Sequence, residues 1–141
     1  MKQQKSKIGL QIRHPFRDLS HVGPILGLKP SIIWKRGDER RTPKGNRIKG
    51  TRQDSRVSFE FKFLPRRPLS EKIRAALTAL EQHRTMLRKL TTTGGTIILY
   101  IGWFCDEHTG MTLDTQILSG IANLRISVEL FVYVPDTPRL G

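Results

Sequence analysis

The residues best suited to chemistry in this chain are a tryptophan and the series of cations that follows it. Residues 28–56 hold ten Lys/Arg and only three Asp/Glu. An indole ring can stack on a nucleic-acid base while neighbouring cations contact phosphates. The candidate binding residues are Trp34, Arg36, Arg40, Arg41, Lys44, Arg47, Lys49 and Arg52. In the alternative interpretation, Trp34 packs at the edge of the core and the cations are only solvated.

The distribution of charge also points to the front of the chain. The formal net charge is +13. Residues 1–27 contribute +4, residues 28–56 contribute +7 and residues 57–141 contribute +2. Such asymmetry predicts an acidic protein or a nucleic acid as partner of the front part, and otherwise a basic surface that serves solubility.

A second group of reactive types is the run Cys105-Asp106-Glu107-His108, which contains four kinds of metal ligand. Consecutive residues at the end of a strand point in different directions, so they do not converge on one ion. The other histidines show no ligand spacing, and neither a nucleophile elbow nor a Walker A loop or GxGxxG motif is present. We therefore expect no metal site, no cofactor, no catalytic residues and no enzymatic activity.

Hydrophobic periodicity shows which elements position these residues. Strict alternation predicts strands at residues 7–13 and 57–63, and a shorter strand follows at 31–34. We interpret Phe59, Phe61 and Phe63 as the core face of their strand, in preference to the stacking aromatics of an RNA-binding sheet. Residues 37–56 are rich in Gly and Pro turn signals and are predicted to be mostly loop. The remaining predicted elements are a short helix at about 20–26, a helix at 70–90, a strand at 96–104, a helix at 112–124 and a strand at 127–134.

This order predicts an α+β fold with a single, mostly antiparallel sheet and helices on one face. The first six elements match a ferredoxin-like order, βαββαβ, to which a C-terminal αβ pair is added. The predicted organisation is a flexible basic tail at 1–6, one domain at 7–135 with a basic loop at 35–56, and a loose tail at 136–141.

Three short phrases in this part of the chain resemble a known family. They are Leu26-Gly27-Leu28-Lys29-Pro30, Trp34-Lys35-Arg36-Gly37-Asp38 and Thr42-Pro43-Lys44-Gly45, with Gly50 downstream. Their order and spacing resemble domain-of-unknown-function family 4279, a family of uncharacterised bacterial proteins, over about residues 8–135. The resemblance implies a first strand, a short helix, an amphipathic helix and two closing strands, and it carries no catalytic residues.

Taken together, these observations predict a non-catalytic binding module that contacts an acidic partner through its basic loop. A nucleic-acid-binding protein is the alternative, and a small-molecule enzyme comes third. The single cysteine, Cys105, the lack of a signal-peptide pattern and the lack of a long apolar run predict a cytoplasmic protein away from membranes. The sequence carries no signal for an oligomeric state.

Overall fold

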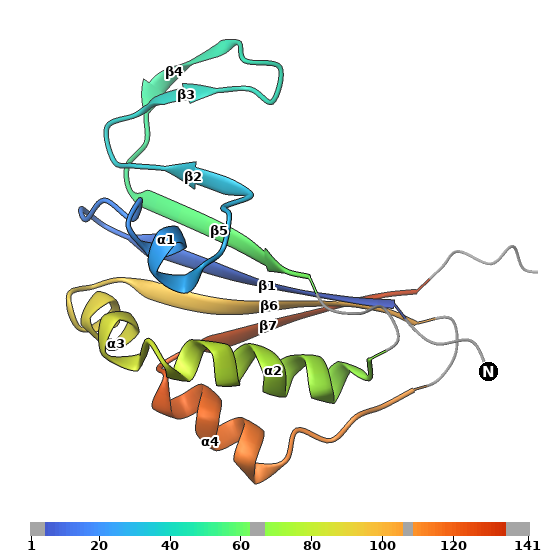
Figure 1. Ribbon diagram of the computed structural model, residues 1–141. Helices are drawn as coiled ribbons and strands as arrows, with labels where there is room; N and C mark the ends of the chain where they lie inside the picture. Colours follow the sequence, from blue (N-terminus) through green and yellow to red (C-terminus); the bar gives the residue numbers. More distant parts are fainter. Residues whose placement is uncertain (1–4, 63–66, 106–108, 135–141) are drawn as a thin grey trace, which may run out of the picture.

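The computed structural model describes residues 5–62, 67–105 and 109–134. Its main feature is a five-stranded sheet with the strand order β2-β5-β1-β6-β7 (Figure 1). The strands of this sheet are β1 (Lys5–His14), β2 (Ile32–Trp34), β5 (Ser55–Phe61), β6 (Thr96–Phe104) and β7 (Ser127–Tyr133). A separate hairpin consists of β3 (Glu39–Arg41) and β4 (Arg47–Thr51). The helices are α1 (Val22–Leu26), α2 (Leu69–Glu81), α3 (Arg84–Thr92) and α4 (Thr115–Asn123).

The first strand, β1, forms the centre of the sheet. It pairs antiparallel with β5 on one side and with β6 on the other. Its alternating residues Ile8, Leu10 and Ile12 are almost fully buried on one face, as the period of a strand requires. Leu10 lies opposite Phe59 on β5 and opposite Leu99 on β6, so these three strands share one apolar face.

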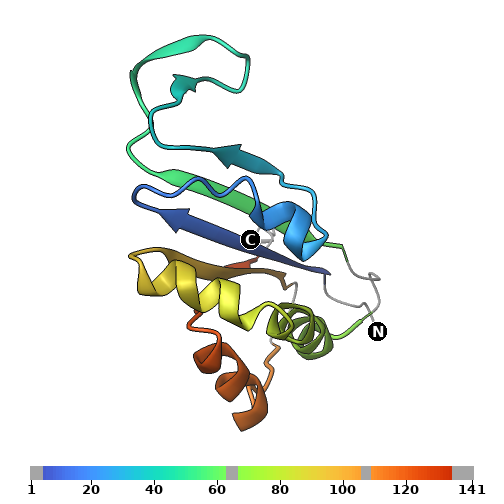
Figure 2. The same ribbon diagram turned by 60° about the vertical axis from the view of Figure 1, so that its left-hand side comes forward.

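Helices cover this apolar face, and none of the described helices lies on the opposite face, which we call the open face (Figure 2). The core side chains of α2 include Ile73, Ala76 and Leu80, and α3 adds Leu87 and Leu90. Helix α4 begins at a true cap, because the Asp114 carboxylate accepts a hydrogen bond from the backbone N–H of Ile117 at 2.9 Å. The ion pair of Asp114 with Arg74 then ties α4 to α2. No helix within the described residues has both the length and the apolar character needed to cross a bilayer.

The sheet is mixed, because its last strand runs parallel to its neighbour. Strand β7 pairs with β6 from Ser127 opposite Ile98 to Tyr133 opposite Phe104. Parallel neighbours need a crossover connection, and α4 lies within that connection. Two stacked ring pairs on the open face join these strands, with centroids 4.9 Å apart for Tyr100 and Phe131 and 4.8 Å apart for Phe104 and Tyr133.

The predicted α+β class is confirmed, while the ferredoxin-like order of elements is not. Residues 37–56, predicted to be mostly loop, contain the β3–β4 hairpin, which stands between β2 and β5 in the chain. The helix predicted at 70–90 is divided at Gln82 and His83 into α2 and α3. The core prediction for Phe59 and Phe61 is confirmed by their burial, and Phe63 lies outside the described residues.

The end of β1 is fixed by a buried histidine. The Nδ1 atom of His14 accepts hydrogen bonds from the backbone N–H groups of Phe16 (3.3 Å) and Arg17 (3.0 Å). The Nε2 atom lies 2.8 Å from the Thr93 hydroxyl. Since Nδ1 acts as acceptor, the ring is neutral, with its proton on Nε2. Burial, followed by the nearby Arg17 charge, lowers the pKa of His14.

The turn that leads into β6 leaves no room for a side chain at Gly95. A Cβ atom there would lie 2.7 Å from the Leu90 carbonyl oxygen and 3.0 Å from the Arg13 carbonyl oxygen. We expect Gly95→Ala to lower the free energy of unfolding by about 1–3 kcal/mol, because backbone groups must shift to make room. Chemical denaturation measures the change. The control is Gly110→Ala, where nothing lies within 4 Å. Equal stability of the two variants would contradict the packing described here.

Protonation of His14 should weaken the fold. The folded-state pKa lies below the ordinary value of 6.5, so the unfolded chain binds the proton more readily. The contribution of neutral His14 to the free energy of unfolding is therefore complete above about pH 6.5, and it is lost as the pH falls below that value. Denaturation at about pH 7.5 and pH 5.5 should show this loss. In His14→Asn the amide oxygen replaces Nδ1 as acceptor, so the loss in this window should shrink. An undiminished loss in that variant would show that another group is responsible.

Candidate binding surface on the β3–β4 hairpin

The β3–β4 hairpin extends beyond β2 at one edge of the sheet (Figure 1). Its strands pair antiparallel with each other, and within the described residues neither pairs with a strand of the main sheet. The turn that joins them is closed by hydrogen bonds from Gly45 N–H to the Thr42 carbonyl at 2.8 Å and from Asn46 N–H to the Thr42 hydroxyl at 3.1 Å. Gly45 has φ +88°, a conformation that favours glycine.

Hydrogen bonds close the base of the hairpin and join it to the sheet. The Gly37 N–H donates to the Arg52 carbonyl at 2.9 Å, and the Arg52 N–H donates to the Asp38 carbonyl at 2.8 Å. The Asp38 carboxylate accepts from the Lys35 N–H at 2.9 Å. On β5, the buried hydroxyl of Ser55 accepts from the Arg36 N–H at 3.0 Å. The orientation of the hairpin is thus set where it leaves the sheet.

Trp34 is half-buried at this base. The Arg52 guanidinium carbon lies 3.7 Å from the centre of the indole ring, and that of Arg56 lies 5.2 Å away. Such cation–π contacts are favourable by about 0.5–2 kcal/mol. Partial burial, then repulsion from Arg13 and Arg52, lowers the pKa of the Arg56 guanidinium. Arg52 thus occupies one face of the indole, so that face is not open to a nucleic-acid base, and Trp34 anchors the hairpin.

The eight predicted binding residues fall into two groups. Trp34 and Arg52 form the half-buried anchor. The other six are exposed cations on the hairpin and its base, namely Arg36, Arg40, Arg41, Lys44, Arg47 and Lys49. Among the described residues, two of these six cations form ion pairs. Arg41 and Arg47 both contact the Glu39 carboxylate, at 2.9 Å and 3.6 Å.

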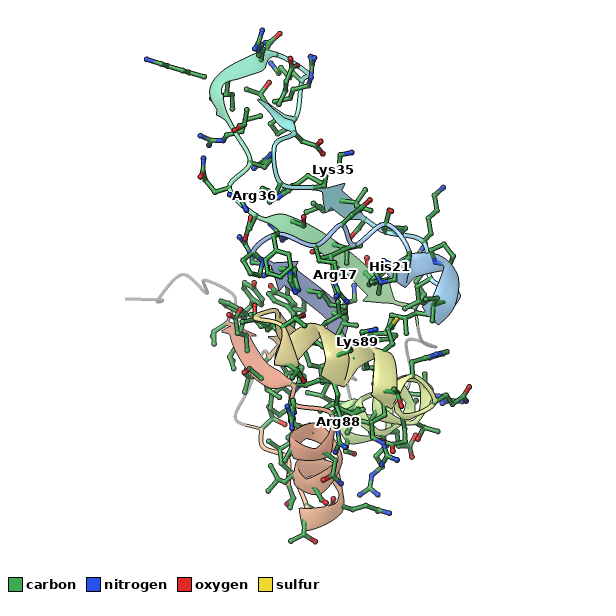
Figure 3. The ribbon with its side chains drawn as sticks, turned by 90° about the vertical axis from the view of Figure 1, so that its left-hand side faces the viewer. Arg17, His21, Lys35, Arg36, Arg88 and Lys89 are labelled. Carbon is green, nitrogen blue, oxygen red and sulfur yellow. The ribbon has the colours of Figure 1, made fainter. Side chains whose placement is uncertain are left out.

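The basic surface continues beyond the hairpin. Figure 3 shows Lys35 and Arg36 near the hairpin, Arg17 and His21 next to them, and Lys89 and Arg88 farther along the same side. We call these six residues the basic band. They come from the segment directly after β2, the segment before α1, and α3. A carboxylate lies close by: the Ser20 N–H donates to Asp18 at 2.9 Å, and this bond, with the charge of Lys35, lowers the pKa of Asp18.

Residues 7–135 match the family described as Domain of unknown function (DUF4279). The chain belongs to this family. No curated protein and no solved structure gives a match.

The second sequence candidate lies at the far end of β6 in this DUF4279 chain. Cys105 is buried, while Asp106, Glu107 and His108 lie outside the described residues. Within the described ranges, the structure contains no group of three or more His, Cys, Asp or Glu side chains placed to hold a metal ion.

Sequence reasoning missed the members of the basic band that lie far from the hairpin in the chain. Arg17, Arg88 and Lys89 reach the same side only because β1 and β6 are neighbours and α3 immediately precedes β6. No local pattern marks them. Lys35, by contrast, adjoins Trp34 in the sequence and could have been included with the candidates.

Loss of the Asp38 carboxylate should loosen the hairpin and leave the main sheet intact. In Asp38→Ala the Lys35 N–H loses its acceptor, a loss of about 0.5–1.5 kcal/mol for such a bond. We expect amide exchange in β3 and β4 to accelerate roughly two- to tenfold, with no change in β1. Asp38→Asn keeps an acceptor oxygen and is the control. Equal acceleration in β1 would show that the hairpin unfolds only together with the sheet.

Proposed function

We propose that this protein is a non-catalytic binding module that contacts an acidic protein surface through the β3–β4 hairpin. The observation that carries the proposal is the excess of positive charge, beyond the ion pairs that the described residues form, on an element that projects from the fold. Guanidinium groups bind carboxylates in a bidentate manner, and the exposed cations of the hairpin are mostly arginines. Charge complementarity of this kind accelerates association and selects acidic partners.

The shape of the hairpin supports the same proposal. An element that serves only to complete the core would be packed against it, yet β3 and β4 pair with each other alone in the described part of the chain. Its base is nevertheless held by the Trp34–Arg52 contact and by the hydrogen bonds of Ser55 and Asp38. A surface held in this way loses less conformational entropy on binding than a free loop would lose.

Nucleic acid is a second candidate, favoured by one specific feature. A two-stranded antiparallel ribbon fits the major groove of duplex DNA, and β3–β4 is such a ribbon with cations along both strands. The basic band would extend a phosphate-binding surface beyond the ribbon. The covered indole face of Trp34 favours duplex over stacked single strands within this alternative.

Charge reversal on the hairpin tests the proposal. The variant Arg40→Glu, Arg41→Glu, Lys44→Glu changes the formal net charge from +13 to +7, since each reversal removes two charges. We expect binding to poly-L-glutamate, used as a carboxylate probe, to weaken at least about tenfold, because attraction becomes repulsion. Fluorescence anisotropy measures the affinity at two salt concentrations.

The matched control is Lys5→Glu, Lys7→Glu, Lys62→Glu. This variant has the same net charge, but its substitutions lie at the other end of β1 and β5 from the hairpin, with all three side chains exposed. Equal weakening by both variants would mean that net charge alone drives binding, and the hairpin would not be the contact surface. Much tighter, hairpin-dependent binding of a duplex would favour the nucleic-acid alternative. No binding of either probe at low salt would contradict both.

A further inference from the structure

The outer strand β7 exposes an unusual amount of apolar surface. All seven of its residues are exposed, and Glu129 is the only charged residue among them. The apolar and aromatic side chains from Val128 to Val134 are between 37% and 73% exposed. With ordinary side-chain sizes, these fractions correspond to roughly 500 Å² of apolar surface. Patches of about this size on soluble proteins commonly mark an interaction site.

The backbone of β7 is open for pairing as well. Within the described residues its pairing partner is β6, and its other side faces no strand. The Tyr133 carbonyl accepts a hydrogen bond from the Cys105 N–H at 2.9 Å, so Tyr133 directs its polar groups toward the β6 side. In a parallel ladder, each residue directs its N–H and its C=O to the same side of the strand, and successive residues alternate between the two sides. Val128, Leu130 and Val132 therefore direct their N–H and C=O groups outward.

The two edges of the sheet differ in how well they are protected against pairing with another strand. Strand β2 has three residues and is followed directly by the cations Lys35 and Arg36 and by the projecting hairpin. Short length and positive charge are common means of protecting an edge. Strand β7 has seven residues, and its pairing with β6 is regular, without a bulge or a proline. An edge of this kind is a template for another strand.

We propose that two copies of this protein associate through antiparallel pairing of their β7 strands about a two-fold axis at Leu130. The two five-stranded sheets would then form one continuous sheet of ten strands. This register pairs all seven residues of each strand, with Leu130 opposite the partner's Leu130 and Val128 opposite the partner's Val132. Each of these residues has outward backbone groups, so the pairs exchange hydrogen bonds.

The composition of β7, with apolar residues around a single carboxylate, suits pairing with a second copy of itself in this register. An axis at Leu130 places Glu129 opposite the partner's Phe131, whereas an axis at Glu129 would bring two carboxylates face to face. Val128, Leu130 and Val132 of each copy then lie together on the helix-side face. The roughly 500 Å² of apolar surface that each copy exposes at this edge sets an upper bound of about 1,000 Å² on the apolar area buried by the pair, which is the lower size limit of biological interfaces. The ring pairs Tyr100–Phe131 and Phe104–Tyr133 hold β7 in place before association.

A lysine at the axis tests this arrangement. In Leu130→Lys two ammonium groups would face each other and the contact between the two leucines would be lost. We expect the dissociation constant of the dimer to rise by at least about a hundredfold. Sedimentation velocity and light scattering, over a wide concentration series, should give the mass of two chains for the wild type and of one chain for the variant.

The matched control is Leu118→Lys on α4, where the side chain is 49% exposed, against 53% for Leu130. This variant should remain a dimer. Circular dichroism confirms that both variants are folded. A monomeric wild type at all concentrations would overturn the proposal, and so would a dimer that Leu130→Lys leaves intact.

A measurement on the unmodified protein provides a second test. By NMR, hydrogen exchange at the outward Leu130 amide should slow as the protein concentration rises. The Phe131 amide, which is directed toward β6, should show no such dependence. Concentration-independent exchange at Leu130 would contradict the pairing. High salt should leave the dimer intact, because its contacts are mainly apolar and between backbones, but it should weaken binding of an acidic partner to the hairpin. Failure of either proposal is therefore distinguishable from failure of the other.

Discussion

Every other element of this protein depends on the double antiparallel pairing of β1. This one strand joins β5 to β6, and its alternation places Ile8, Leu10 and Ile12 against the helices. Because side chains alternate between faces, a shift of one residue in β1 would turn this apolar set toward solvent. The register is therefore strongly specified, and the positions of the hairpin at one edge and of β7 at the other follow from it.

The separation of charge from the core has a physical cause. Lys and Arg are costly to bury without a partner, and the chain carries 25 of them against 12 Asp and Glu. In the sheet, cations lie on the open face and at the edges. The hairpin projects beyond one edge and packs little against the core, so its cations stay in solvent. Lys72 of α2 is buried, and it has polar partners there, since its ammonium group donates to the Ser6 carbonyl and hydroxyl.

Elements that pack against the core could be predicted from the sequence, because burial imposes a period on their residues. This holds for β1, β5 and β6. The hairpin lacks such a period: β3 reads Glu-Arg-Arg, and β4 reads Arg-Ile-Lys-Gly-Thr, so turn signals dominated the prediction. The break at His83 was missed because Leu80, Leu87 and Leu90 continue the apolar pattern through it.

The sequence located the cation-rich segment but not its internal structure, and its role as a binding site stays a prediction. Arg40, Arg41, Lys44, Arg47 and Lys49 lie on the projecting hairpin, whereas Lys35, Arg36 and Arg52 lie at its base. The role of Trp34 depends on the contact with Arg52, which is eighteen positions away in the chain and which no local pattern encodes. The exposure of β7 was equally hidden, since an apolar strand at an edge and one at the centre of a sheet have similar sequences.

The placement of β2 and β7 at opposite edges gives the pair of copies a definite geometry. Joined at β7, they would have their two β2 strands nine strand spacings apart, or roughly 40 Å, and the two basic hairpins would lie beyond these edges, farther apart still. A ligand with two acidic patches at that separation would be held at both ends, and its release would require both contacts to open together. The sheet would then act as a spacer that selects ligands by the distance between their charges.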